Sequence, residues 1–232
     1  MYKCIAIITA RGGSKRIPKK NIKEFCGKPI IAYSIEAAME SGVFDEVMVS
    51  TDSEEIADVA RRYGAVIPFY RSEETSNDFA STDDVLHEVI ERYENMGKQF
   101  ESFCCIYPTA PFISADRLKE AYSLIDQGAD EVIPVVKYDY PPQRSFVIRD
   151  GNIVFQYPEN EYKRSQDLEP IYHDSGQFYF LKTKEYCSKK SLLCKKTVPL
   201  VLTDMEVQDI DTIEDWNMAE LKYKILNNMK FD

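Results

Sequence analysis

The sequence predicts an α/β fold in which helices flank a mostly parallel β-sheet. Short, continuous apolar runs recur along the first 136 residues, as expected of strands that are buried on both faces. Between these runs lie longer segments whose apolar residues recur at helical spacing. Strands and helices that alternate in this way form a mostly parallel sheet with helices on both of its faces.

The individual elements are predicted from their boundaries. Pro29 suits the first turn of a helix and Gly42 suits its C-terminal stop, while the next helix begins with carboxylates that favour a helix N-terminus. Gly-Gly after the first apolar run marks the end of the first strand. The predicted strands are residues 3–9, 45–51, 65–69, 102–108 and 130–136, and the predicted helices are residues 29–42, 52–64, 81–97 and 115–128.

The pattern changes after residue 137, where no clear helix follows. Two apolar runs joined by Asp150-Gly151 predict a β-hairpin. We interpret residues 137–172 as a small antiparallel arm, either a lid or an oligomer contact. Further strands at residues 197–202 and 207–211 and a helix from Thr212 return to the α/β body, so residues 1–232 are expected to form a single domain.

Composition excludes several classes of protein. Of the 232 residues, 44% are hydrophobic and 29% charged, as in ordinary globular proteins. No apolar run approaches the roughly 20 residues that cross a bilayer, and the first apolar run is too short for a signal peptide, so we expect a cytoplasmic protein with no membrane contact. The net charge of −10 argues against nucleic-acid binding.

One loop is strongly basic although the whole chain is acidic. It follows the first predicted strand, contains Gly12 and Gly13, and carries six cationic side chains: Arg11, Lys15, Arg16, Lys19, Lys20 and Lys23. Ligands of parallel α/β sheets bind at this end of the strands. The loop matches neither common phosphate-binding motif, but its glycines would let backbone N–H groups approach a phosphate. A solvated basic turn is the alternative.

A pair of carboxylates lies far away in the sequence. Asp209 and Asp211 are two residues apart in a strand-like run, which would place both side chains on one face. Carboxylate oxygens suit Mg²⁺. Thr212 and the acidic residues after it could instead cap the last helix, although capping does not explain Asp209. A phosphate-binding loop together with a magnesium site would indicate nucleotide chemistry at phosphorus.

Five stretches together closely resemble the CMP-sugar synthetases, the cytidylyltransferases that activate sialic acids and related nonulosonic acids. They are ARGGSKRIPKKNI, MVSTDSEEIA, PFYRSEETSNDFAST, YPTAPF and DIDTIEDW, and the resemblance covers essentially the whole chain. It implies a Rossmann-like nucleotidyltransferase fold with a small dimerisation arm, and therefore a homodimer.

The resemblance also implies roles for individual residues. Arg11, Lys15 and Lys20 would contact the phosphates of CTP and act in catalysis, and Asp209 and Asp211 would bind Mg²⁺. The nucleotide-binding residues would be Ala10, Arg11, Gly12, Gly13, Lys15, Asn21, Arg71, Ser81 and Thr82. Arg16 and Lys19 are interpreted as solvated or supporting residues.

The sugar side differs from the sialic-acid pattern. Tyr107 in YPTAP stands where sialic-acid synthetases have a glutamine, and HDSGQFYF replaces another of their motifs. With YPPQRSF, these segments look most like pseudaminic acid cytidylyltransferases. The candidate sugar-binding residues are Tyr107, Gln143, Arg144, Arg164, Gln166, His173, Asp174 and Gln177.

The resemblance therefore implies transfer of CMP from CTP to the anomeric hydroxyl of a nonulosonic acid, with release of pyrophosphate. Pseudaminic acid is the preferred substrate of this interpretation. N-acetylneuraminic, legionaminic and octulosonic acids are the alternatives. A noncatalytic nucleotide or sugar sensor is a further alternative, which retention of both the basic loop and the aspartates disfavours.

Overall fold

A seven-stranded sheet forms the centre of the protein in the computed structural model, which describes residues 2–189 and 194–229. Within these residues the strand order is β11-β6-β10-β5-β1-β4. β9 lies off this path and pairs with the C-terminal residues of β6. The strands of this sheet are β1 (Tyr2–Thr9), β4 (Glu46–Ser50), β5 (Phe100–Ile106), β6 (Glu131–Lys137), β9 (Tyr172–Asp174), β10 (Phe178–Lys182) and β11 (Thr197–Leu202).

Five of these strands run in the same direction. β1 pairs in parallel with β4 and β5, and β6 pairs in parallel with β11. β10 lies between β5 and β6 and is antiparallel to both, and β9 is antiparallel to β6. The predicted α/β fold with a mostly parallel sheet is confirmed.

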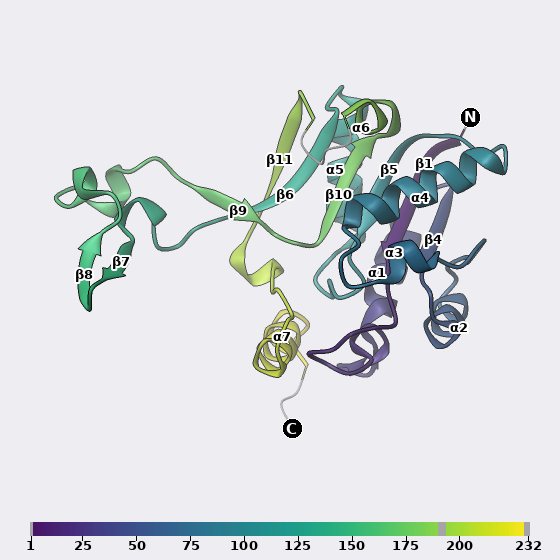
Figure 1. Cartoon of the computed structure of the whole chain (residues 1–232), viewed down its shortest axis with the longest axis horizontal. Coiled ribbons are helices and arrows are strands. Elements are labelled where there is room, and N and C mark those ends of the chain that lie inside the picture. Colours follow the sequence, from purple (N-terminus) through teal and green to yellow (C-terminus); the bar gives the residue numbers. More distant parts are fainter. Residues whose placement is uncertain (1, 190–193, 230–232) are drawn as a thin grey trace.

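Helices cover both faces of the sheet (Figure 1). They are α1 (Ile30–Ser41), α2 (Glu54–Arg62), α3 (Glu73–Ser76), α4 (Thr82–Asn95), α5 (Ala115–Asp126), α6 (Thr183–Lys189) and α7 (Ile213–Leu226). None of the described helices is both long enough and apolar enough to cross a bilayer.

The side chains of β1 show why the strand reads as one continuous apolar run. Cys4, Ala6 and Ile8 lie in one hydrophobic core, which also contains residues of α1, α2 and α5. Ile5 and Ile7 point to the opposite face and pack in a second core with residues of α4. Because successive side chains of a strand alternate between faces, both sets are buried and none needs to be polar.

Two predicted strands are wrong. Residues 65–69 form only an isolated bridge between Val66 and Met48, and Pro68, which has no N–H to donate, follows two residues later. Residues 207–211 are irregular: they follow a short 3₁₀ helix, η5 (Asp204–Glu206), and pair with no strand in the described chain. The short helices α3 and α6 were not predicted.

The arm projects from the body between the end of β6 and the start of β9 (Figure 1). It holds the predicted hairpin, made by β7 (Phe146–Arg149) and β8 (Asn152–Phe155). Asp150 and Gly151 both have positive φ, of 49° and 77°, as a type I′ turn requires. Three 3₁₀ helices complete the arm: η2 (Pro142–Arg144), η3 (Pro158–Asn160) and η4 (Ser165–Asp167). The remaining elements, in the body, are η1 (Lys20–Ile22), β2 (Glu24–Phe25) and β3 (Lys28–Pro29).

Candidate active site

The basic loop leaves the C-terminal end of β1 and lies against the chain that follows β4. The Gly12 backbone N–H donates to Asp52 Oδ1 at 2.7 Å. A Cβ atom at Gly12 would lie 3.1 Å from Ser53 Cβ, so this close approach favours glycine. The side chain of buried Asn21 donates to the Arg11 carbonyl at 2.9 Å. These contacts fix the backbone of the loop next to the sheet.

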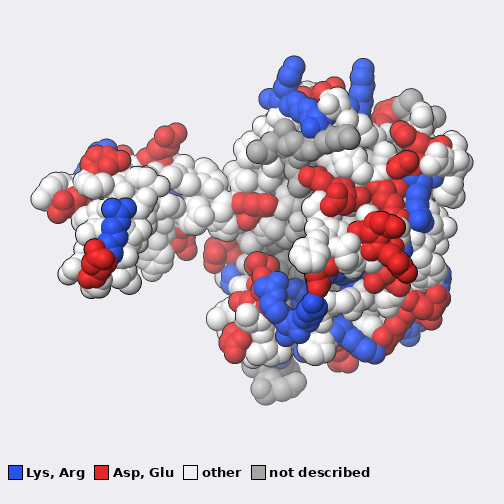
Figure 2. All heavy atoms as spheres, viewed as in Figure 1, with Lys and Arg blue, Asp and Glu red and all other residues white. Residues whose placement is uncertain are grey.

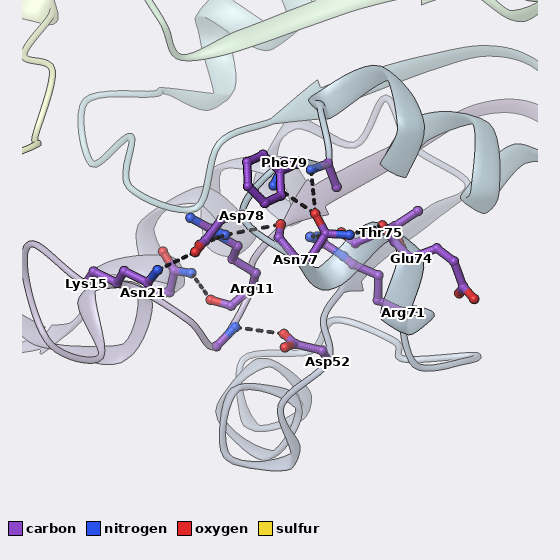
Figure 3. A network of polar contacts seen from close by, with 12 residues as sticks. Arg11, Lys15, Asn21, Asp52, Arg71, Glu74, Thr75, Asn77, Asp78 and Phe79 are labelled. Carbon is purple, nitrogen blue, oxygen red and sulfur yellow. Dashed lines mark hydrogen bonds and ion pairs between the residues drawn. The ribbon is translucent and has the colours of Figure 1, made fainter.

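Two cations of the loop converge on one carboxylate (Figure 3). Arg11 Nη1 lies 2.8 Å from Asp78 Oδ1, and Lys15 Nζ forms an ion pair with Asp78 Oδ2. Asp78 belongs to the segment between α3 and α4. The pKa of Asp78 is lowered by its hydrogen bonds, first to Lys15 and then to Arg11. Arg11 and Lys15 are thus close enough to bind one anionic group together.

The other end of the loop contacts the segment before α7. Lys20 Nζ donates to the Ile210 carbonyl at 2.5 Å and lies 3.6 Å from Asp211 Oδ1. Arg16 Nη1 lies 2.7 Å from Asp211 Oδ2. Arg16 was interpreted as solvated or supporting, and its contact with a predicted metal ligand agrees with the supporting alternative. Lys19 instead pairs with Glu55 of α2 at 2.7 Å.

Figure 2 shows Lys and Arg side chains gathered in a patch on the lower body, beside the position of α7 in Figure 1, with Asp and Glu side chains around it. On the face that Figure 2 shows, this patch is one place where positive charge gathers although the chain as a whole is acidic.

Arg71 lies beside the basic loop in Figure 3, at the C-terminal end of β4. Its Nη2 donates to the Ser50 carbonyl at 2.8 Å and its Nε to Ser50 Oγ at 3.1 Å. Burial of the guanidinium lowers the pKa of Arg71. Ala10, another nucleotide-binding candidate, is buried, and its N–H donates to the same Ser50 carbonyl at 2.9 Å. Both residues therefore contact the C-terminal end of β4, which is paired with the end of β1 from which the loop departs.

Ser81 and Thr82 lie at the start of α4. Ser81 is the N-cap, and its side chain and that of Asp84 form a reciprocal capping box. The Thr82 hydroxyl lies 3.4 Å from the Tyr107 hydroxyl, which joins α4 to the loop after β5. Burial raises the pKa of Tyr107.

A cleft of about 530 Å³ opens on the other side of Tyr107. Asp174 is held there by the Tyr179 hydroxyl, which donates at 2.6 Å, and by the Gly176 N–H at 2.8 Å. Gln177 is buried, and its amide donates to the Glu206 carbonyl at 2.5 Å. The cleft brings together four of the sugar-binding candidates and one metal candidate: Tyr107, His173, Asp174, Gln177 and Asp209.

The other four sugar-binding candidates lie in the arm, which stands apart from the body (Figure 1). Gln143 donates to the Glu169 carbonyl at 2.7 Å, and Arg164 forms two hydrogen bonds with Asp167, at 2.7 and 3.0 Å. Arg144 ends η2, and Gln166 lies within η4. One chain therefore does not bring these side chains to its own cleft.

Asp209 and Asp211 face different neighbours. Asp209 is exposed and lines the cleft, whereas Asp211 faces the basic loop. Thr212 is the N-cap of α7 and forms a capping box with Asp215, so the alternative capping role is filled without Asp209 or Asp211. Residues 2–189 and 194–229 contain no cluster of three or more His, Cys, Asp or Glu side chains suited to a metal. Mg²⁺ commonly binds through one or two carboxylates together with substrate phosphates, and these two aspartates provide donors of that kind.

Sequence reasoning missed Asp52, Asp78 and Tyr179. Asp78 follows Asn77 in a polar stretch that has no periodic pattern, and its cationic partners are more than 60 residues away. Asp52 is the first residue of the helix predicted at residues 52–64, whereas in the structure Ser53 is the N-cap of α2 and Asp52 accepts from the Gly12 N–H. Only the three-dimensional structure reveals these contacts.

Comparison with known proteins identifies similar chains. The family model described as Cytidylyltransferase matches residues 5–229. A pseudaminic acid cytidylyltransferase of Campylobacter jejuni is 43% identical over 231 residues, which cover 99% of this chain and 100% of that protein. A CMP-N,N′-diacetyllegionaminic acid synthase of Legionella pneumophila is 38% identical and covers 93% of this chain and 94% of its own.

The fold is also similar to that of a solved structure, CMP:2-keto-3-deoxy-manno-octonic acid synthetase in complex with CTP. The TM-score is 0.69, with 98% of this chain and 100% of the other covered. At 16% sequence identity, this likeness concerns the fold.

Proposed function

The chain belongs to the cytidylyltransferase family, and on this premise we propose that it transfers CMP from CTP to the anomeric hydroxyl of pseudaminic acid. It is a nucleotidyltransferase, and its similarity to a pseudaminic acid cytidylyltransferase along the whole chain supports this choice of sugar. The observation that carries the proposal is the placement of Arg11, Lys15 and Lys20 in one loop at the C-terminal end of β1, next to Asp211.

In the proposed reaction the anomeric oxygen of the sugar attacks the α-phosphorus of CTP. A new O–P bond forms, the bond to pyrophosphate breaks, and the hydroxyl proton passes to solvent or a nearby base. Arg11 and Lys15 would bind phosphate oxygens, since both already bind the oxygens of one carboxylate. Lys20 would stabilise charge on the transferring or departing phosphate. These cations would act by orienting the phosphates and neutralising their charge.

Nucleotidyltransferases of this type generally use a divalent metal, and we propose Mg²⁺ at Asp209 and Asp211. Bound Mg²⁺ would neutralise phosphate charge and lower the pKa of the attacking hydroxyl. Asp211 would present its carboxylate toward the phosphates, because Arg16 and Lys20 already hold it beside the basic loop. Asp209 would present its carboxylate from the cleft.

The cleft beyond Tyr107 is the proposed sugar site. Tyr107, which lines the cleft, also lies 3.4 Å from the hydroxyl of the nucleotide candidate Thr82. His173, Asp174 and Gln177 would provide polar contacts for hydroxyl and acylamino groups. An anionic sugar also needs a cation for its carboxylate. Arg144 and Arg164 are suitable cations, but both lie in the arm.

We therefore propose a homodimer in which the arm of one copy packs on the other. The arm presents large apolar side chains to solvent: Ile148 is 77% exposed and Ile153 is 69% exposed. In Figure 2 much of its surface carries neither acidic nor basic side chains. A projecting surface of this composition is typical of protein contacts.

The experiment that tests the function is a pyrophosphate-release assay with CTP and Mg²⁺. The panel contains pseudaminic, N-acetylneuraminic, legionaminic and octulosonic acids. Preference for pseudaminic acid supports the proposal in full. Preference for another sugar would retain the cytidylyl transfer and contradict the sugar assignment. CTP binding without pyrophosphate release for any sugar would favour the nucleotide sensor.

The metal assignment is tested by Asp211→Ala in the same assay. We expect turnover to fall at least 100-fold, as for the loss of a group that stabilises charge in the transition state. Glu214→Ala is the control, because Glu214 is an exposed carboxylate in the first turn of α7. Its turnover should stay within about twofold of that of the unchanged protein, the scale of a weak surface charge effect. Near-normal turnover of Asp211→Ala would contradict the assignment.

A further inference from the structure

Residues 77–80, which we call the Asp78 loop, connect α3 to α4 and cover one end of the basic loop. Asp78 accepts from Arg11 at 2.8 Å and from Lys15, and the Asn77 carbonyl accepts from Arg11 Nη1 at 3.3 Å. Among the described residues, these are the polar contacts that the Asp78 loop makes outside residues 74–80. Arg11 and Lys15 therefore hold this loop to the body.

The Asp78 loop is a turn that its own residues stabilise. Asn77 Oδ1 accepts from the N–H groups of Phe79 and Ala80, at 2.8 and 3.0 Å, and Asn77 Nδ2 donates to the Glu74 carbonyl at 2.6 Å. Phe79 is 97% exposed, so no apolar packing ties the tip of the loop to the body. Such a turn can move as a unit once Asp78 is released, because its internal hydrogen bonds do not depend on the body.

Asp78 binds the two cations in the way that a phosphate group would. One carboxylate oxygen contacts Arg11 and the other contacts Lys15. A triphosphate needs the same two donors, and each cation has a limited number of directions from which it can donate. Asp78 and a triphosphate at this site therefore compete.

We propose that Asp78 is an internal competitor that holds Arg11 and Lys15 in the free protein and is displaced when the triphosphate of CTP binds. The displaced Asp78 loop then carries Phe79 away from its position beside the basic loop. This inference rests on the proposed function, because it assumes that the ligand is a nucleoside triphosphate. Asp78 acts through Arg11 and Lys15 and is a positioning residue.

The test measures CTP binding by calorimetry, with the full chain and Mg²⁺, for the unchanged protein, Asp78→Asn and Glu74→Gln. Two weak, exposed ion pairs no longer have to be broken in Asp78→Asn, so we expect its Kd for CTP to fall about threefold to tenfold. Glu74→Gln removes the same charge from an exposed residue four positions away. Its Kd should change by less than about twofold, since screened surface charges interact weakly.

Steady-state kinetics and a fluorescent reporter separate competition from a merely structural role. Asp78→Asn should lower the KM for CTP by a factor similar to that for Kd and leave kcat within about twofold, as expected for a change in ground-state binding. In Phe79→Trp, CTP should change the tryptophan emission. In the double variant with Asp78→Asn, the free protein should already have the emission of the CTP-bound state.

An unchanged or higher Kd of Asp78→Asn for CTP would overturn the inference, and so would an emission of Phe79→Trp that does not respond to bound CTP. The same titrations with inorganic triphosphate separate this inference from the proposed function. Failure of the unchanged protein to bind CTP would contradict the function. Tighter binding of inorganic triphosphate by Asp78→Asn would still support the competitor, and equal or weaker binding would overturn it.

Discussion

Lys20 and Lys15 belong to the same loop but have very different surroundings. The Lys15 side chain is 77% exposed, whereas that of Lys20 is 17% exposed and its ammonium donates to the Ile210 carbonyl. A largely buried ammonium with a fixed acceptor is preorganised, because it loses little freedom when it stabilises a new charge. Lys20 is therefore the cation of the loop from which we expect the largest catalytic effect.

At this scale we predict that Lys20→Met lowers kcat by about 100-fold to 1000-fold, as removal of one preorganised donor typically does. Single-turnover measurements with saturating CTP would report this loss directly. Lys19→Met is the matched control, since Lys19 pairs with Glu55 on the surface, and should keep kcat within about twofold. Equal losses in both variants would show that the total charge of the loop matters more than the position of Lys20.

The sequence predicts the site only as far as its charges are close together along the chain. The basic loop is a contiguous signal, so Arg11, Lys15 and Lys20 could be identified together. Their partners could not, because Asp78 is 63 residues from Lys15 and the Lys20 acceptor is 190 residues from Lys20. A pattern of residue types contains no information on which distant carboxylate will meet a given cation.

At the scale of elements, η5 connects the sheet to the segment that carries Asp209 and Asp211. Glu206 of η5 forms two hydrogen bonds with Arg117 of α5, at 2.8 and 3.1 Å. The Glu206 carbonyl also accepts from Gln177 in the cleft. One bidentate ion pair thus links α5 to both the cleft and the proposed metal-binding segment.

The ion pair between Arg117 and Glu206 should make the free energy of unfolding depend on pH. Hydrogen bonds, first from Arg117, lower the pKa of Glu206 from its ordinary value of 4.5 to about 2. A carboxylate with a depressed pKa in the folded state stabilises the fold above its unfolded pKa, and this stabilisation is lost as the pH falls from about 4.5 toward 2.

We therefore predict that Glu206→Gln lowers the free energy of unfolding at pH 7 by roughly 1–3 kcal/mol, the range for hydrogen bonds to charged groups. The difference from the unchanged protein should shrink between pH 4.5 and pH 2 in urea titrations. Glu120→Gln removes a more exposed partner of the same arginine, at 2.8 Å, and should have a smaller effect at every pH. A difference that does not vary with pH would rule out the ion pair as its source.

Elements with strong periodicity or distinctive turns were predictable, and those that depend on a partner were not. The Asp150-Gly151 turn specifies its hairpin locally, because only certain residues tolerate positive φ at both positions. Residues 65–69 and 207–211 have strand-like composition, but a strand also needs a neighbour along its length. The segment 207–211 instead follows η5 to α7, where cation contacts and a helix cap fix its course.

At the scale of the whole molecule, the arm extends well beyond the α/β body on one side (Figure 1). If two copies pack through it, a charge at its apolar surface should prevent their association. We predict that Ile148→Asp shifts the protein from dimer to monomer in analytical ultracentrifugation at micromolar concentration, because a buried unpaired carboxylate strongly disfavours an interface.

Met96→Asp is the control for this prediction. Met96 is an exposed apolar residue at the end of α4, outside the arm. The Met96→Asp variant should therefore leave the mass of the assembly unchanged. A dimer that survives Ile148→Asp would mean that the copies associate elsewhere, or through a part of the arm that does not include β7.

The position of β10 has a consequence for the timing of synthesis. β10 fills the space between β5 and β6, yet the ribosome makes it only after the entire arm. At roughly 5–20 residues per second, several seconds separate the emergence of β5 from that of its second neighbour. During this interval the nascent chain exposes an open β5 edge of buried, apolar character, which can pair with other chains. The length of the arm therefore sets how long this edge of β5 stays unpaired while the chain is being made.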